Sequence, residues 1–140
     1  MVNNARVDPK ALVGEWNFER TIVDRIGGST KRVVGQTAIE EKIDGRLRWY
    51  ESGTLFDGDL ELAVFRTLFI EQQDGNWAVT FEDGREFHEW NPGQDVEHLC
   101  GADTYRGRVD IEAATEGWSV EWTVSGPSKD YTMTTYLTRH

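Results

Sequence analysis

The sequence predicts an all-β fold, a single antiparallel up-and-down β-barrel of eight to ten strands with a short N-terminal helix. Three observations lead to this prediction. Val, Ile and Thr total 31 residues against 16 for Ala and Leu, and β-branched residues favour strands. Asp-Gly pairs separate the apolar runs, as they do in hairpins. No run between strands is long and polar enough for the crossover helix that parallel strands need.

Turn residues divide residues 1–140, which we expect to form one domain, into nine predicted strands. Type I′ turns are predicted at the Asp-Gly pairs, which begin at Asp44, Asp57, Asp74 and Asp83. Glu116-Gly117 and Gly126-Pro127 mark two further turns. The strands fall at about 15–25, 31–43, 46–55, 60–72, 76–82, 85–91, 103–113, 117–125 and 129–139. Closing them into a barrel removes the exposed edges.

The predicted helix covers residues 8–13. Asp8 is a suitable N-cap, and Pro9 occupies the first helical position, where its missing N–H costs nothing.

Period-2 alternation assigns side chains to the inner or outer face of the barrel. Apolar residues dominate one end of the inner face, for example Trp16, Val109 and Leu137. A two-residue turn at Asp83-Gly84 would place His88 opposite Val79 and so turn it inward. The other end of the inner face carries polar residues, namely Arg20, Asp24, Asp103, Tyr105, Lys129 and Tyr131. Buried charges persist only when they are paired or reached by water or a ligand, so this end predicts an open pocket.

The pocket predicts binding of a small organic molecule with aromatic and anionic or hydroxyl groups. Its predicted ligand-binding residues are Arg20, Arg66, Asp103, Lys129, Tyr131, Trp49, Glu51, Trp90 and Trp122. An anionic ligand would be repelled by the acidic exterior, so its association should become faster with added salt. Binding through a protonated His88 should weaken as the pH rises through roughly 6–7.

Two other classes of function stay open. The first is an isomerase or cyclase, in which His88 or Asp24 is the acid–base group and Tyr105 or Lys129 is the electrophilic partner. The second is a structural or protein-interaction module, whose inward polar groups pair with one another and leave no cavity. In that case Arg20 and Asp24 belong to an interior ion-pair network with Lys129 or Asp103, and His88 is a core histidine bonded to Tyr105 or Glu51.

Composition limits the partners. A net charge of −10 argues against nucleic acid and anionic membranes, and no apolar run is long enough to span a membrane. Cys100 is the only cysteine, which excludes a disulfide scaffold and favours the cytoplasm. His98-x-Cys100-x-x-Asp103 lacks the usual zinc spacing, so we expect no metal, no other cofactor and a buried, unreactive Cys100. The oligomeric state is left open.

The segment Leu12-Val13-Gly14-Glu15-Trp16, with Arg139 at the end of the last strand, resembles the signature of the lipocalin or calycin barrels. The resemblance implies that Trp16 packs under Arg139 at the closed end of the barrel. The sequence departs from lipocalins in lacking the Thr-Asp-x-x-Tyr motif, a disulfide and a helix after the last strand.

Over nearly its full length the chain is similar to an uncharacterised bacterial family of lipocalin-like domains of unknown function. The similarity rests on Gly14-Glu15-Trp16 with Arg20 and Asp24, 81–85 with Phe87-His88, His98-x-Cys100-x-x-Asp103-x-Tyr105, and 126–131. It implies the barrel and no particular reaction.

Overall fold

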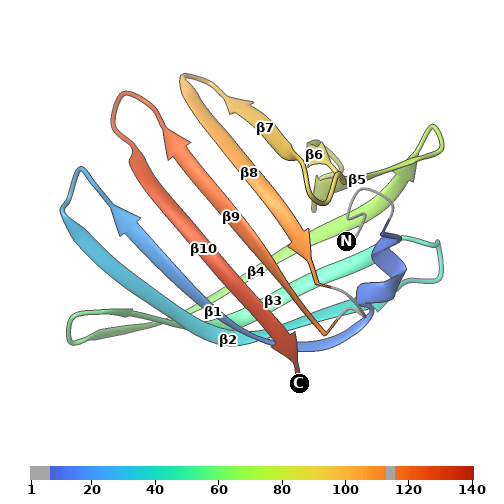
Figure 1. Cartoon of the computed structure of the whole chain (residues 1–140), viewed down its shortest axis with the longest axis horizontal. Helices are drawn as coiled ribbons and strands as arrows, with labels where there is room; N and C mark the ends of the chain where they lie inside the picture. Colours follow the sequence, from blue (N-terminus) through green and yellow to red (C-terminus); the bar gives the residue numbers. More distant parts are fainter. Residues whose placement is uncertain (1–6, 113–115) are drawn as a thin grey trace.

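A computed structural model describes residues 7–112 and 116–140. These residues form one 3-10 helix and ten strands (Figure 1). The elements are η2 (Pro9–Leu12), β1 (Gly14–Asp24), β2 (Ser29–Glu41), β3 (Leu47–Asp57), β4 (Leu60–Gln73), β5 (Asn76–Phe81), β6 (Glu86–Glu89), β7 (Asp95–Cys100), β8 (Asp103–Ile111), β9 (Gly117–Ser125) and β10 (Asp130–Arg139).

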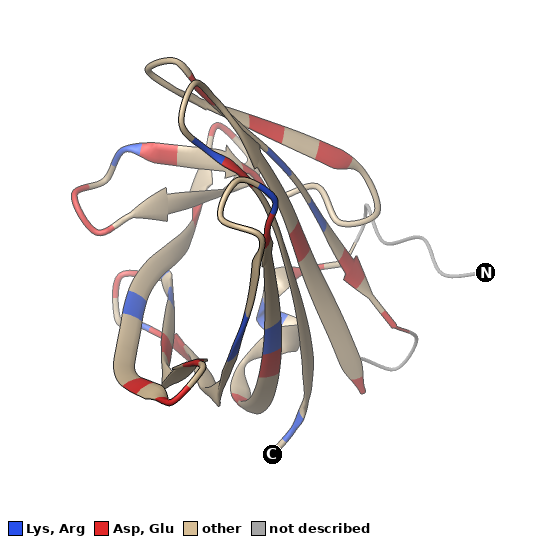
Figure 2. Ribbon diagram, turned by 90° about the vertical axis from the view of Figure 1, so that its left-hand side faces the viewer, with Lys and Arg blue, Asp and Glu red and all other residues tan. Residues whose placement is uncertain are grey.

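The strands form one antiparallel sheet in the order β6-β5-β4-β3-β2-β1-β10-β9-β8-β7. Each strand pairs with its neighbours in the sequence except at one place, and β1 also pairs with β10 in the middle of the sheet. The exception is the junction between β6 and β7, the two ends of the sheet. Figure 2 shows the strands curving around a common axis. The predicted up-and-down barrel is therefore confirmed, with a seam between β6 and β7.

Strand β7 is absent from the sequence-based prediction. Its inward positions are Val96, His98 and Cys100, of which only the first is a strongly apolar strand former. The alternation that reveals the other strands is therefore weak here. Cys100 is exposed, so the expectation that it is buried is wrong.

The Asp-Gly pairs do form hairpin turns, but only one has the predicted type I′ geometry. Both residues have positive φ at Asp74 (52°) and Gly75 (83°). Elsewhere only the glycine does. At two of these turns the aspartate carboxylate accepts a hydrogen bond from the backbone N–H two residues later, as Asp44 does from Arg46 and Asp83 from Arg85. This local hydrogen bond stabilises a turn in which only the glycine, and not the aspartate, has a positive φ.

The apolar end of the barrel is closed by η2 and the end of β10. Asp8 caps η2 by accepting a hydrogen bond from the Lys10 N–H, as predicted. The Trp16 indole N–H donates to the Leu12 carbonyl (2.9 Å), and the Arg139 guanidinium lies 4.0 Å from the Trp16 ring centre. Arg139 also donates to the carbonyls of Val13 and Ala11. The predicted contact between Trp16 and Arg139 is confirmed.

Replacing Arg139 should open this end of the barrel. We expect Arg139→Ala to lower the free energy of unfolding by roughly 1–3 kcal/mol, because the indole face loses its cover and two carbonyls lose a donor. Urea denaturation measures the change. Arg106→Ala removes an exposed arginine from β8 and should change it by less than about 0.5 kcal/mol. Equal effects of the two substitutions would contradict a packing role for Arg139.

Candidate functional site

The other end of the barrel carries the polar residues. Five hairpins lie there, β1–β2, β3–β4, β5–β6, β7–β8 and β9–β10, because antiparallel strands alternate in direction. At the closed end the inward side chains are completely buried, as Trp16 and Ile39 are. Towards the hairpins several inward side chains are only half-buried, namely Ile22, Leu55, Val64, Tyr105 and Met133. Solvent therefore reaches the inner wall of this half, which we call the open half.

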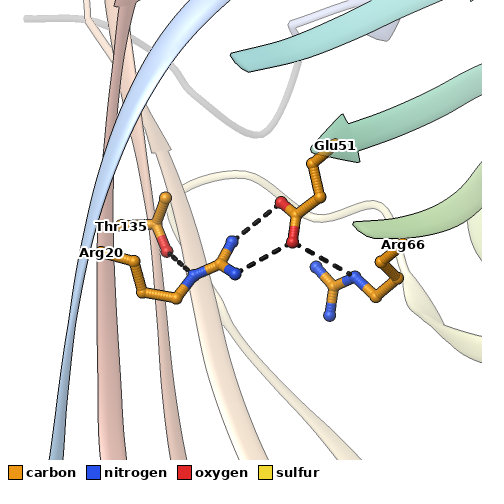
Figure 3. A network of polar contacts seen from close by, with 4 residues as sticks. All are labelled: Arg20, Glu51, Arg66 and Thr135. Carbon is orange, nitrogen blue, oxygen red and sulfur yellow. Dashed lines mark hydrogen bonds and ion pairs between the residues drawn. The ribbon is translucent and has the colours of Figure 1, made fainter. Parts of the chain in front are cut away.

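Three charged side chains meet inside the barrel in the open half (Figure 3). Arg20 on β1 binds Glu51 on β3 through two hydrogen bonds of 2.8 and 2.9 Å, and its Nε donates to the Thr135 hydroxyl on β10 (2.8 Å). Arg66 on β4 approaches the same carboxylate, with its Nε 3.8 Å from Glu51 Oε1. Arg20, Glu51 and Arg66, which are all predicted ligand-binding residues, therefore lie together inside the barrel.

This cluster holds two positive charges and one negative charge. Burial raises the pKa of Glu51, but the hydrogen bond from Arg20 and the positive charges of Arg66 and Arg20 outweigh it, so the pKa lies below the ordinary value. Burial lowers the pKa of Arg66, while Glu51 opposes that shift. All three groups are charged at neutral pH, since an arginine pKa starts far above 7. One positive charge is therefore left over.

A second polar cluster lies at the rim, where the β7–β8 and β9–β10 hairpins meet. The Lys129 ammonium is 2.9 Å from the Asp103 carboxylate and donates to the Tyr105 hydroxyl (3.5 Å). These contacts raise the pKa of Lys129. Burial and the neighbouring Tyr105 raise the pKa of Tyr131, which therefore stays a neutral hydrogen-bond donor. Here the charges of Lys129 and Asp103 neutralise each other.

His88 lies on β6 opposite Val79, as predicted, and is 5% exposed. Its Nδ1 is 2.7 Å from the Glu89 carbonyl oxygen, which only accepts, so Nδ1 carries the hydrogen. Burial lowers the pKa of His88 from 6.5 to about 4; the electrostatic effects of His98 and Arg66 act in the same direction, against the bond to Glu89. His88 is therefore neutral at pH 7. The expectation that His88 titrates near neutrality is therefore wrong, whereas the pH dependence of ligand binding stays a prediction.

Asp24 lies at the end of β1 and stabilises the following turn. Its Oδ1 accepts hydrogen bonds from the backbone N–H groups of Ile26 (3.0 Å) and Gly27 (3.2 Å). Arg20 bonds to Glu51 instead, a partner that the alternation pattern does not identify. An acid–base role for Asp24 stays a prediction.

The predicted aromatic residues lie in three different places. Trp122 stacks on Phe87 (4.9 Å between ring centres) near His88. Trp49 is buried against Trp118 (5.3 Å). Trp90 lies away from Trp122 and Trp49, and its indole N–H donates to the Val7 carbonyl (3.1 Å). It lines a hollow of about 620 Å³ next to the β4–β5 turn.

Sequence reasoning missed two residues near the site. Thr135 orients Arg20, and its only sequence signal is its place on the inner face of β10. His98 lies on the unpredicted β7, with its ring 5.1 Å from that of Phe87. Among the described residues, no three His, Cys, Asp or Glu side chains lie close enough together to hold a metal ion. No helix in the described ranges is long and apolar enough to cross a membrane.

The fold and the site define an all-β barrel with a packed end and a charged, solvent-reached end. The chain belongs to a family of unknown function, DUF6314, whose model matches residues 12–139. None of the curated proteins matches the sequence.

Among the solved structures similar to this chain, two each cover 94% of it. The structure of EF1p2_mFAP2b bound to DFHBI has a TM-score of 0.50 and 13% identity, with 95% of that chain covered. A protein of unknown function of the DUF3598 family from Nostoc punctiforme has a TM-score of 0.42 and 12% identity, with 48% of that chain covered. At 13% identity the likeness to the first structure shows the fold alone.

Proposed function

We propose that this protein binds a small organic anion in the open half of the barrel, and that Arg66 is the residue that contacts the anion. The observation that carries this proposal is that Arg20 binds Glu51 closely, whereas Arg66 only approaches it. Arg20 uses its Nε and both terminal nitrogens in hydrogen bonds. Arg66 has only the 3.8 Å approach to Glu51, and its side chain is 40% exposed.

Arg66 therefore keeps a set of N–H donors free among the described residues. A guanidinium offers five donors in a fixed fork that matches a carboxylate or phosphate group. Arg20 and Glu51 act as positioning residues, because their ion pair fixes the carboxylate that Arg66 faces. The excess positive charge of the cluster is the opposite of the net charge of the chain.

The rest of the ligand would lie along the inner wall. This wall offers half-buried apolar surface from Leu55, Val64 and Met133, and the phenol groups of Tyr105 and Tyr131 at the rim. Lys129 and Asp103 bond to each other, so they would act as a neutral pair beside the ligand. An apolar wall with a few fixed polar groups is typical of small-molecule sites.

We also infer that the barrel is lipocalin-like. The meandering order of strands, the 3-10 helix at the closed end and the contact of Trp16 with Arg139 support this inference. The similar barrel of EF1p2_mFAP2b was solved bound to DFHBI, which is compatible with ligand binding by such a fold. The single cysteine supports a place in the cytoplasm.

The test compares 2-naphthoate with its neutral analogue 2-naphthamide by isothermal titration calorimetry. We expect the carboxylate to bind at least about tenfold more tightly, and Arg66→Gln to remove that difference, because a charged hydrogen bond is worth roughly 1.5–3 kcal/mol. Arg106→Gln, on the outer wall, should leave both affinities within about twofold. Equal binding of the two compounds, or a carboxylate affinity indifferent to Arg66→Gln, would refute the anion site.

A second candidate is the isomerase or cyclase on the same scaffold. The observation that favours it is the neutral His88 ring, whose Nε2 is unprotonated and has no hydrogen-bond partner among the described residues. If His88 is the acid–base group, His88→Gln should bind the substrate as tightly as the native protein does but should no longer turn it over. A loss of affinity without any turnover in the native protein would assign His88 to binding.

A further inference from the structure

The seam between β6 and β7 contains a hollow separate from the anion site. It measures about 350 Å³, within the usual range for small-molecule sites. Its walls come from β6 and β7, which do not pair with each other, and from the loop between them, and they include Glu86, Phe87, His88, Glu89 and His98. The hollow exists because no hydrogen bonds join these strands in the described part of the chain.

His88 lines this hollow and carries an acceptor without a protein donor. Since Nδ1 donates to the Glu89 carbonyl, the lone pair of Nε2 is free, and no described residue donates to it. His88 is 5% exposed, and its ring packs edge to face against both Phe87 (5.0 Å between ring centres) and Trp122 (5.3 Å). An acceptor without a protein donor favours a ligand that brings an N–H group.

The charge around the hollow is negative. None of its lining residues is Lys or Arg. Glu97 is paired with Arg106 (2.9 Å) and Asp95 approaches Arg108 (3.5 Å) on the outer wall. Glu86 and Glu89 have no ion pair among the described residues, and the only side-chain bond to Glu89 comes from Asn91 (3.4 Å). Two negative charges are therefore uncompensated at the rim.

The hollow also has an aromatic wall. Phe87 and His98 meet edge to face, with 5.1 Å between their ring centres and an interplanar angle of 90°. His98 is half-buried, so part of its ring is open to a ligand. Both faces of Phe87 are covered, by Phe81 (4.8 Å between ring centres) and Trp122 (4.9 Å). The open aromatic surface is therefore that of His98, whose ring can accept a planar group.

We propose that the β6–β7 seam is a second binding site, which takes a small planar organic cation with N–H donors, such as an amidinium or guanidinium group. One N–H donates to His88 Nε2, Glu86 and Glu89 supply the opposite charge, and the plane of the cation lies against His98. This chemistry is the reverse of that at Arg66, where an anion is bound.

Benzamidine and its neutral analogue benzamide provide the test, by calorimetric titration of the full chain at pH 7. We expect benzamidine to bind and benzamide to bind at least about tenfold more weakly, because only benzamidine carries the charge. His88→Phe keeps a ring of similar size without the acceptor, and should weaken benzamidine by about tenfold. Glu86→Gln with Glu89→Gln, both at exposed positions, should weaken it by a similar factor even if His88→Phe does not fold.

The matched control is Glu121→Gln on the outer face of β9, which removes a negative charge away from the seam. It should leave the affinity for benzamidine within about twofold. The proposal is overturned if benzamidine binds no better than benzamide, or if folded His88→Phe keeps the native affinity. It is also overturned if Glu121→Gln weakens binding as much as the pair at Glu86 and Glu89, since net charge would then explain the effect.

Discussion

Glu51→Gln should lower the free energy of unfolding by about 3–5 kcal/mol, the usual cost of breaking a buried ion pair from one side. The Glu51 side chain is 9% exposed and that of Arg20 is 14% exposed. Without the carboxylate, Arg20 keeps a buried charge with no counter-ion, and Arg66 adds repulsion. Urea denaturation at pH 7 measures the loss.

The control is Asp83→Asn, which breaks an exposed ion pair with Arg85 in the β5–β6 turn. Exposed pairs contribute at most about 1 kcal/mol, so this change should be small. A loss in Glu51→Gln no larger than in Asp83→Asn would contradict a buried network. The folded fraction of Glu51→Gln should also bind 2-naphthoate more tightly, because Arg20 then adds a free positive charge.

The same network makes a contribution to stability that depends on pH. The pKa of Glu51 in the folded protein lies below its ordinary value of 4.5. The stabilisation is therefore complete above pH 4.5 and is lost as the pH falls through the lowered pKa. Glu51→Gln should flatten this acid limb of the stability profile.

Lowering the pH from 7 to 4.5 should decrease the free energy of unfolding of the native protein by roughly 2 kcal/mol more than that of His88→Phe. In the unfolded chain the imidazole takes a proton below its ordinary pKa of 6.5, whereas in the barrel its pKa is about 4. The unfolded state therefore binds more protons in this window, and stability falls with falling pH. Urea denaturation of the native protein and of His88→Phe at both pH values measures the difference.

The control for this experiment is His140→Gln, at the exposed end of the chain. It should lose stability between pH 7 and pH 4.5 as the native protein does. A native profile with the same slope as His88→Phe would contradict the lowered pKa. A nitrogen-15 spectrum of the histidine rings gives a direct check, because Nε2 of His88 should stay unprotonated at pH 6.

Local sequence patterns were sufficient where the structural cause is local. Alternation placed Arg20, Glu51 and Tyr105 on the inner face because successive residues of any strand point to opposite sides of the sheet. The Asp-Gly pairs located the hairpins because the conformation of a turn depends on only a few adjacent residues. Strand β7 escaped this reasoning because two of its three inward residues, His98 and Cys100, interrupt the apolar pattern.

Contacts between distant strands were beyond such reasoning. The β-barrel, its inward face and its polar end were determined by the sequence alone, through residue propensities and spacing that act over a few positions. The pairing of Arg20 with Glu51 depends on how β1, β2 and β3 are staggered and curved, and no pattern within one strand contains that information. The neutral state of His88 and the seam beside it likewise arise only in the tertiary structure, because burial and the pairing of strand edges depend on parts of the chain that are far apart in sequence.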